Sequence, residues 1–424
     1  VIDSGLENVA IYDVQTLSNK LQQRSIAKSS AIQRAGRAGR LQAGHCIRLY
    51  SKDDFERRSE QSSSEIQQAD LLPMLMEVAR WGATACEQLP MIEMPNATKE
   101  QLAWQELIDL ALVTHKHQLT AQGKQAAAFP CHPRFSKMLL AALQLEQSQQ
   151  VEHLLSLACL LVSLLEERDI FSAEQRLDNC DITQRITQLL QLAKKPQHQR
   201  IIQQAQRLYQ VTVRQSSDAN DASDFELTNT NKRICNTAAQ LPLQCTGLLL
   251  MLAYPERLAK QRDHQGNYLT AYGKGLVMNS GDALADKEYL VAVQFFQRQN
   301  TLAIGLAADI NLSQAIAWQV VAVESKTHLH FDHKQNRIRC ANQQVIGSLV
   351  ISEENTLQKL STELFIECWC QQIRKRGLSW LKLDEQTQQL LLRWRWLNQT
   401  QKHLAFEDVS EIHLLSTLEQ WLGP

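Results

Sequence analysis

Hydrophobic residues in the middle of the chain recur every three to four positions, which is the spacing of helices that bury one face. We expect such helices at 135–145, 151–165, 182–194 and 197–208. The second segment is apolar nearly all round, which predicts a central buried helix. A polar stretch at 216–224 follows, and its Ser, Asp and Asn residues predict a loop.

Shorter elements precede this helical region. Asp70 can cap a helix that ends near Gly82, and Thr98 can cap a second helix. A short hairpin is predicted at 113–119, and Thr120 can cap the helix after it. Two helices followed by a hairpin and a further helix are typical of a winged helix.

Strand signals dominate from 268 to 351. Strands are predicted at 289–293, 302–306, 319–323, 328–332, 337–340 and 349–351, with a hairpin turn at 332–336. An OB-type barrel fits the first part of this region. Helices are predicted on both sides of it, at 243–260, 360–372, 384–397 and 411–422.

The first 58 residues read as the tail of an α/β domain. Strands are predicted at 1–2 and 9–12, and a buried strand at 46–50 follows a helix that Gly44 ends. Residues 59–65 are polar and Ser-rich, which suits a linker. Because the chain begins without Met, in what reads as the middle of a strand, we expect a fragment of a longer protein.

Composition narrows the class of protein. The chain of 424 residues has 44 % hydrophobic and 21 % charged residues, which is ordinary for a globular protein. Its formal net charge is −1, so binding to nucleic acid must use local patches. Ten cysteines occur without C-x-x-C spacing, which predicts a reducing, cytoplasmic location and no metal site. No run of 18 apolar residues predicts a membrane span.

The densest candidate chemistry lies at 33–40, where the sequence is Gln-Arg-Ala-Gly-Arg-Ala-Gly-Arg. In a helix, Gln33, Arg37 and Arg40 occupy positions i, i+4 and i+7 and project from one face. Guanidinium groups match phosphate oxygens in charge and geometry, and they stay charged at any working pH. This pattern favours a phosphate-bearing ligand.

The surroundings of this stretch support that interpretation. Gly36 and Gly39 leave room for a ligand to approach the backbone. Residues 24–48 include six Lys or Arg and no Asp or Glu, which favours a polyanion. Two alternatives stay open: a solvated basic helix, or a capping box in which Ser30 and Gln33 bond the start of a helix.

The stretch 33–40 resembles motif VI of the DEAH-box class of superfamily 2 helicases. Residues 1–5 (Val-Ile-Asp-Ser-Gly) are similar to the segment after motif V of that class, and 44–51 to the strand after motif VI. Residues 129–134 resemble the winged-helix end. The tail from 357 resembles the front part of a region found in the bacterial HrpB branch of the class.

The resemblance implies a multidomain fold of α/β and α+β type. In chain order we expect the C-terminal part of the second RecA-like domain at 1–62, a winged helix at 63–132, a helical ratchet at 133–240, an OB-like β-rich domain at 241–352 and the start of an HrpB-type C-terminal region at 353–424.

The resemblance also implies an ATP-dependent RNA helicase. Neither G-x-x-x-x-G-K-[ST] nor Asp-Glu-Ala-His occurs, so ATP and Mg²⁺ would be held mainly by an N-terminal half outside this chain, and the fragment alone should be inactive. Carried over from the family, Gln33 would touch the γ-phosphate region. Arg37 and Arg40 would be catalytic arginine fingers on the transferring phosphoryl group. Arg34 would face away and be structural.

Single-stranded RNA, or another nucleic acid, is the partner that the resemblance implies. Arg257, Lys260, Arg262 and Lys274 are candidate contacts from their place around the entry to the OB-like domain, with ordinary solvated charges as the alternative. The sequence Arg-Trp-Arg-Trp at 393–396 could stack on bases, or its indoles could pack against neighbouring helices.

Two other functions stay open at this point. One is a nucleic-acid-binding module without ATPase activity, and the other is a protein-interaction scaffold built on the helical tail. A P-loop and an Asp-Glu-Ala-His motif upstream would decide for the helicase. A gel shift with single-stranded RNA would separate the other two.

Overall fold

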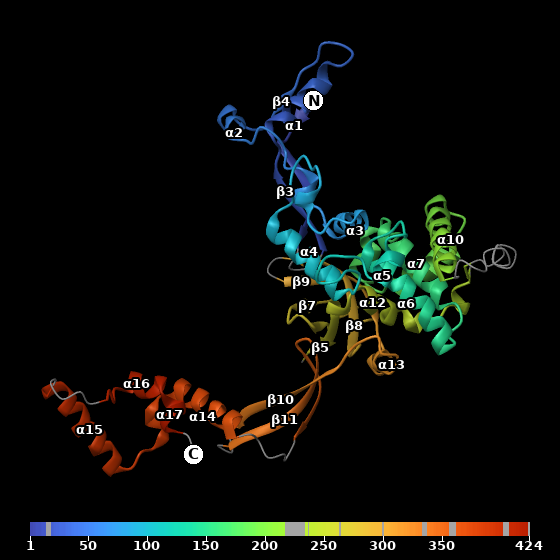
Figure 1. Cartoon of the computed structure of the whole chain (residues 1–424). Helices are drawn as coiled ribbons and strands as arrows, with labels where there is room; N and C mark the ends of the chain where they lie inside the picture. The colour runs from blue at the N-terminus through green and yellow to red at the C-terminus, as the bar shows by residue number, and fades with distance from the viewer. Residues whose placement is uncertain are drawn as a thin grey trace. The chain divides into compact units, whose positions relative to one another are not determined.

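The computed structural model describes residues 1–13, 18–216, 234–235, 237–262, 264–298, 301–332, 337–355, 362–401 and 407–422. Two compact units divide the chain, Val1–Val321 and Ala322–Pro424. Figure 1 shows their elements in chain order by colour. All but the first residue of the predicted loop at 216–224, and all but the first residue of the predicted turn at 332–336, lie outside the described residues.

The N-terminal residues form two small strand pairs. β1 (Ile2–Asp3) pairs in parallel with β4 (Ile47–Arg48), and β2 (Leu6–Asp13) pairs antiparallel with β3 (Ser18–Ser25). The prediction of a buried strand at 46–50 is wrong for this chain, because β4 is two residues long and Ile47 is 59 % exposed. Helix α1 (Lys28–Gly36) and the 3-10 turn η1 (Arg37–Gly39) connect the two pairs.

Three helices and a short bridge follow, as the sequence predicted. They are α3 (Leu72–Trp81), α4 (Ala97–Asp109) and α5 (Ala121–Ala126). Asp70 accepts the backbone N–H of Leu72 at 2.9 Å, and Thr120 caps α5. The bridge joins Val113 to Leu119. The cap of α4 is Asn96 rather than Thr98, because the Asn96 side chain accepts the Thr98 N–H.

The helical region packs around one apolar helix. Its members are α6 (Pro133–Gln149), α7 (Leu154–Glu166), α8 (Ala173–Leu177), α9 (Ile182–Gln191) and α10 (Pro196–Ser216). Every residue of α7 from Leu154 to Leu164 is buried, which confirms the prediction of a central helix. Figure 1 shows α6 and α10 beside α7, and both contact it.

A closed five-stranded barrel follows the helices. Helix α12 (Thr246–Ala253) ends well before the predicted Lys260, because Pro255 lacks an N–H and disfavours helical backbone at the residue before it. The strands run in the order β5-β6-β7-β9-β8. Their bounds are β5 (Leu258–Gln261), β6 (Asn267–Thr270), β7 (Gly275–Val277), β8 (Tyr289–Arg298) and β9 (Thr301–Asp309).

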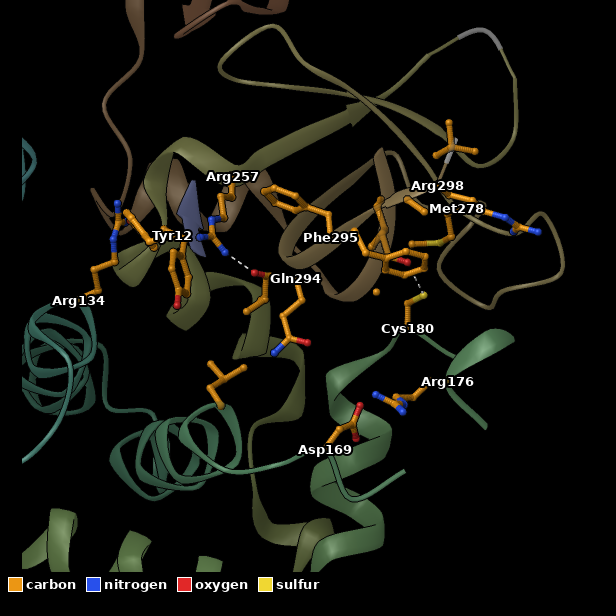
Figure 2. Close-up of a pocket in the computed structure, with 18 of the residues that line it drawn as sticks. Tyr12, Arg134, Asp169, Arg176, Cys180, Arg257, Met278, Gln294, Phe295 and Arg298 are labelled. Atoms are coloured by element: carbon orange, nitrogen blue, oxygen red, sulfur yellow. Dashed lines mark hydrogen bonds between the residues drawn. The ribbon is translucent and has the colours of Figure 1, made fainter. Parts of the chain in front are cut away.

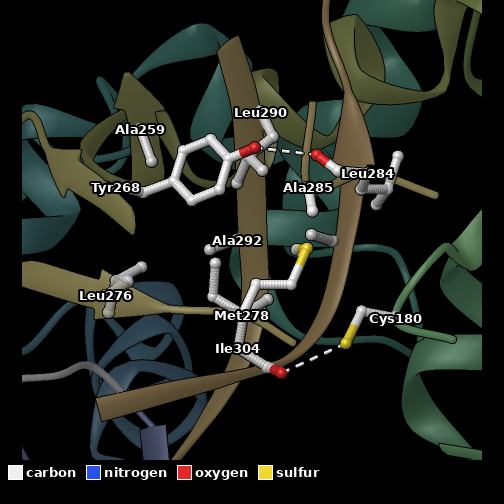
Figure 3. Close-up of a cluster of buried hydrophobic side chains, with 11 residues drawn as sticks. Cys180, Ala259, Tyr268, Leu276, Met278, Leu284, Ala285, Leu290, Ala292 and Ile304 are labelled. Atoms are coloured by element: carbon white, nitrogen blue, oxygen red, sulfur yellow. Dashed lines mark hydrogen bonds between the residues drawn. The ribbon is translucent and has the colours of Figure 1, made fainter. Parts of the chain in front are cut away.

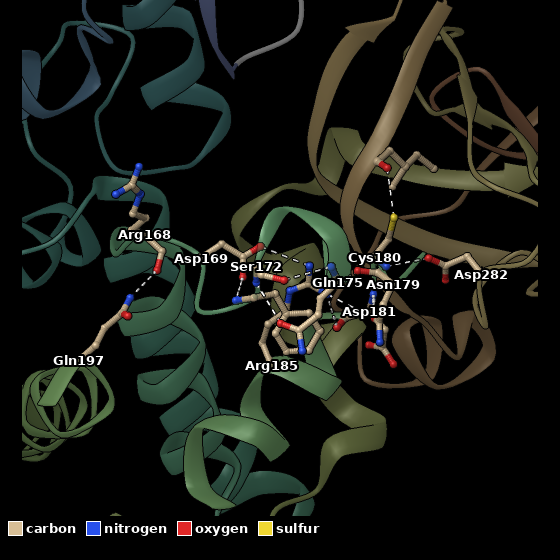
Figure 4. Close-up of polar contacts among 12 residues, drawn as sticks. Arg168, Asp169, Ser172, Gln175, Asn179, Cys180, Asp181, Arg185, Gln197 and Asp282 are labelled. Carbon is tan, nitrogen blue, oxygen red and sulfur yellow. Dashed lines mark hydrogen bonds and ion pairs between the residues drawn. The ribbon is translucent and has the colours of Figure 1, made fainter. Parts of the chain in front are cut away.

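The barrel core includes a residue from the helical region. Tyr268 is fully buried and its hydroxyl donates to the Leu284 carbonyl oxygen at 2.7 Å (Figure 3). The Cys180 thiol, which comes from the segment after α8, donates to the Ile304 carbonyl oxygen at 3.2 Å. The Cys180 N–H donates to Asp282 at 2.7 Å (Figure 4). These bonds join the helical region to the barrel.

The second unit has its own sheet and helices. A three-stranded antiparallel sheet is followed by four α-helices: β10 (Glu324–Asp332), β11 (Arg337–Ile346), β12 (Leu349–Asn355), α14 (Thr362–Arg376), α15 (Glu385–Thr400), α16 (Glu411–Ser416) and α17 (Leu418–Trp421). The strands of this sheet are not part of the barrel. The structure therefore divides after 321, whereas the predicted domain boundary lay after 352. The strand predicted at 319–323 is absent, since 318–322 is irregular after α13 (Leu312–Ala317).

Candidate functional site

Arg34 of α1 and Arg37 of η1 are three positions apart and have different surroundings. Arg34 donates through Nη1 to Asp3 Oδ1 at 2.9 Å and to the Leu6 carbonyl oxygen at 3.1 Å. Asp3 is 2 % exposed and also accepts from the Gly5 N–H and the Tyr50 hydroxyl. Burial alone would raise the pKa of Asp3, but these hydrogen bonds outweigh burial and lower it. Arg34 therefore holds the start of β2.

The other candidates on this segment are exposed. Gln33, Arg37 and Arg40 form no side-chain hydrogen bond or ion pair within the described part of the chain. The predicted single α-helix needs one correction, because it ends at Gly36 and continues as a 3-10 turn. Arg37 begins this turn and Arg40 follows its last residue, three positions later.

The glycines of the segment differ in whether a side chain would fit at their positions. A Cβ added at Gly36 or Gly39 would meet no atom within 4 Å, so the space beside both is open. A Cβ at Gly44 would lie 2.0 Å from the Ala38 carbonyl oxygen, so only glycine lets the chain turn back there. The capping-box alternative is wrong, because α1 begins after Ala27 and Ser30 lies inside the helix.

A large cavity of about 1260 Å³ lies elsewhere in the first unit. Residues from β2, the segments around α3 and α6, the 254–257 turn and strands β8 and β9 line it, as Figure 2 shows. Five aromatic side chains face it: Tyr12, Phe135, Tyr254, Phe295 and Phe296. Phe296 is 52 % exposed, so its ring face is open for stacking.

The charges around this cavity favour an anion. Its three carboxylates are bonded within the protein: Asp70 to His132 at 3.1 Å, Glu166 to the His132 N–H at 3.0 Å, and Asp169 to Arg185 at 3.3 Å. Figure 4 shows the last of these contacts. Arg176 and Arg298 are exposed, and their side chains form no hydrogen bond or ion pair among the residues that the structure describes. Two cations are thus available to a ligand.

The predicted nucleic-acid residues separate into three places. Arg257 lines the large cavity but is only 5 % exposed, and its guanidinium lies 4.0 Å from the Tyr254 ring centre. Arg262 and Lys274 line a second cavity of about 550 Å³ on the barrel. Lys260 lines neither cavity and lies 5.6 Å from the Tyr289 ring centre.

Sequence reasoning missed the residues that line the cavity most openly. Phe296 and Arg298 occupy alternate positions of β8 and so share one face of the strand. The sequence Phe-Phe-Gln-Arg at 295–298 carries that signal, an aromatic and a cation two residues apart. The two tryptophans of the sequence at 393–396, which was predicted to stack on bases or to pack against helices, differ in exposure. Trp396 is 61 % exposed, while Trp394 is partly buried.

Neither a membrane-spanning helix nor a metal cluster occurs within the part of the chain that the structure describes. None of the described helices is long and apolar enough to cross a membrane. Within the described ranges, no group of three or more His, Cys, Asp or Glu could hold a metal ion.

Comparison with known protein families gives a match to one part of the chain. Residues 132–225 match the helicase-associated domain (HA2), described as ratchet-like. These residues include α6 to α10, so the prediction of a helical ratchet is supported by an independent match. This part of the chain is therefore similar to a ratchet-like domain that is associated with helicases.

The chain as a whole is similar to HrpB. It is 26 % identical over 426 residues to the ATP-dependent RNA helicase HrpB of Escherichia coli (strain K12), covering 100 % of this chain and 47 % of that protein. A crystal structure of the E. coli DExH-box NTPase HrpB gives a TM-score of 0.67 at the same coverage. The E. coli RNA helicase HrpA is 34 % identical over 147 residues, 34 % of this chain and 11 % of that protein. The predicted resemblance to DEAH-box helicases of the HrpB branch is confirmed, and the chain spans about half of the HrpB sequence.

Proposed function

We propose that this chain is the C-terminal half of an ATP-dependent RNA helicase, in which Arg37 and Arg40 act on nucleotide held by the other half. The observation that carries the proposal is the contrast within one helical segment. Arg34 is bonded to Asp3, whereas the side chains of Arg37 and Arg40 are exposed and without partners in the described chain. The resemblance to HrpB along the whole chain supports it.

The chemistry follows from where negative charge develops. When bound with Mg²⁺, ATP supplies a γ-phosphoryl group whose oxygens carry charge during transfer. Two guanidiniums on one short segment would stabilise that charge, and the backbone that carries them is already helical. Gln33, on the preceding turn, can donate its amide to the same oxygens. The open backbone at Gly36 and Gly39 admits the phosphates.

The exposed N-terminal strands fit a partial domain. Parallel strands are normally covered on both faces, yet Ile2 is 73 % exposed and Ile47 is 59 % exposed. We propose that the remainder of a RecA-like domain covers β1 and β4 in the intact protein.

The finer domain assignments are also proposals. The Val113–Leu119 bridge with α3, α4 and α5 supports a winged helix at 63–132, and the closed barrel supports an OB-like domain from 241. The ten cysteines are all free, which supports a cytoplasmic location.

We further propose that the large cavity binds single-stranded RNA. Phe296 would stack on a base, while Arg176 and Arg298 would contact phosphates. Arg257, in the wall of the cavity, would attract RNA by its charge. Arg262 and Lys274 would form a second contact with RNA on the barrel. Lys260 would contribute only long-range charge.

Steady-state ATPase kinetics on the intact protein test the proposal, with and without single-stranded RNA. Arg37→Ala and Arg40→Ala should lower kcat by about 10³-fold or more, with a smaller effect on KM, because each removes charge from the transition state. Arg57→Ala, at an exposed arginine outside this segment, is the matched control and should keep wild-type turnover.

Thermal melts complete the test. Arg37→Ala should melt like wild type, whereas Arg34→Ala should melt earlier because it leaves Asp3 buried without its cation. An Arg37→Ala protein that melts early and keeps its turnover would show a structural residue. An intact protein that binds single-stranded RNA in a gel shift but does not hydrolyse ATP would favour a binding module without ATPase activity.

A further inference from the structure

One side chain of the large cavity comes from the N-terminal hairpin. Tyr12 lies near the end of β2, while every other lining residue comes from 70–305. Its side chain is 8 % exposed and lies among the sticks of Figure 2. Its hydroxyl forms no hydrogen bond among the residues that the structure describes, and it is not one of their fully buried unpaired polar atoms. Because Tyr12 lines the cavity, this hydroxyl is available to whatever occupies it.

The hydroxyl can act as a donor at any working pH. Burial and the nearby carboxylate of Asp70 raise the pKa of Tyr12 well above its ordinary value, so the phenol stays protonated. Phosphate oxygens and base carbonyls are acceptors of the kind that a phenol can bond. An RNA strand in the cavity offers both.

The opposite end of the same strand is bound to the arginine helix. Arg34 donates to the carbonyl oxygen of Leu6, the first residue of β2. Arg58 donates to the carbonyl oxygen of Gly5 at 3.0 Å. Arg34 lies in the same helical segment as Arg37 and Arg40. The start of β2 and the candidate fingers are therefore connected by one side chain.

The strand itself is suited to transmit a displacement. Six residue steps separate Leu6 from Tyr12, which is roughly 20 Å of extended chain. β2 pairs with β3 along its whole length, so it does not bend independently of its partner. At the cavity end, the Tyr12 N–H donates to the Gln68 carbonyl oxygen at 2.7 Å, which bonds the backbone of β2 to the segment before α3.

We propose that Tyr12 couples occupancy of the cavity to the arginine helix. Its hydroxyl donates to an acceptor on single-stranded RNA, and β2 carries the resulting displacement through Leu6 and Arg34 to Arg37 and Arg40. This inference rests on the proposed function. By linkage, the factor by which RNA changes nucleotide affinity equals the factor by which nucleotide changes RNA affinity.

The experiment measures that factor on the intact protein. The Kd of a labelled oligouridylate is determined with and without a non-hydrolysable ATP analogue, and the ratio of the two values is the coupling factor. Wild type should give a factor of about 5 or more. Tyr12→Phe, which removes only the hydroxyl, should bring it to within about twofold of one. Tyr272→Phe is the control, because that side chain is 62 % exposed and lines neither cavity.

Each other result has a distinct meaning. If Tyr12→Phe weakens RNA binding equally with and without the ATP analogue, Tyr12 contacts RNA but does not couple it to the arginine helix, and the proposal is overturned. Unchanged affinities in both states would overturn the contact as well. A wild-type factor of one would overturn the coupling while leaving RNA binding intact. A wild-type protein that binds no RNA in either state would instead refute the proposed function.

Discussion

Single residues in this chain take their roles from what surrounds them rather than from their type. Arg34 and Arg37 are three positions apart and carry the same charge, yet one pairs with a buried carboxylate and the other is exposed. Arg257 shows the same effect, since a charge predicted to contact nucleic acid is 5 % exposed and bonds the Val293 carbonyl oxygen. Charge patterns locate such residues but do not tell exposed ones from buried ones.

The Asp3–Arg34 pair predicts a pH dependence. The pKa of Asp3 is lowered from 3.8 in the folded state, so its contribution to stability is present above that value and is lost as pH falls through the lower folded pKa. We expect Asp3→Asn to lose about 1–3 kcal/mol of unfolding free energy at pH 7, and the difference from wild type to shrink below about pH 4. Urea unfolding at several pH values measures it.

Asp53→Asn, at an exposed carboxylate, is the control for this measurement and should follow wild type at every pH. A deficit of Asp3→Asn that stays constant down to pH 3 would mean that folding does not lower the pKa of Asp3.

At the scale of elements, one arginine connects three of them. Arg134, near the start of α6, is 3 % exposed and pairs with Glu106 of α4 and with Glu256 of the turn after α12. It also donates to the Ala253 carbonyl oxygen at 2.7 Å, at the end of α12. These bonds hold the ends of three helices at one point.

We expect Arg134→Ala to destabilise the chain by about 3–5 kcal/mol, because the nearly buried Glu106 loses its cation and Glu256 keeps only Arg257 at 3.7 Å. Arg134→Lys should lose less, since it keeps the charge but forms fewer hydrogen bonds. Arg200→Ala, at an exposed arginine of α10, should cost little. Chemical unfolding of the three variants checks this order, and an Arg134→Ala protein as stable as Arg200→Ala would contradict it.

Elements were predictable where burial leaves a pattern in the sequence. Helix α7 is apolar all round because all its sides are covered, and its prediction was close to the observed bounds. Strand β3 was missed because Leu21 is its only apolar residue and is itself 73 % exposed, so no alternation exists. Strands β5 to β7 were missed because three or four residues are too short to show a period. The arginine and glycine pattern at 33–40 was visible in the sequence, whereas the place of Tyr12 and Arg298 in the cavity required the fold.

At the scale of the whole molecule, the near-zero net charge limits the proposed affinity for RNA. The formal charge of −1 offers no general attraction, so the proposed binding would depend on local cations such as Arg176 and Arg298. Weak binding that depends on a few phosphates should therefore respond strongly to salt.

We expect this chain to bind single-stranded RNA with an affinity that falls as salt rises. Arg298→Ala should reduce the slope of log K against log salt by about 0.7, the value for one phosphate contact on a single strand. Arg57→Ala is the control and should keep the slope. Fluorescence anisotropy at several salt concentrations measures it, and tight binding that is insensitive to salt would contradict a phosphate-based site.

The bonds of Arg134 also limit how such proteins can recombine. Its two carboxylate partners lie 28 positions before it and 122 positions after it. A chimera that exchanges only the segment before α6 between two relatives brings in a new residue at position 106 while keeping the old ones at 134 and 256. Successful exchanges should therefore replace all three positions together, whereas the boundary after Val321 can be crossed without separating them.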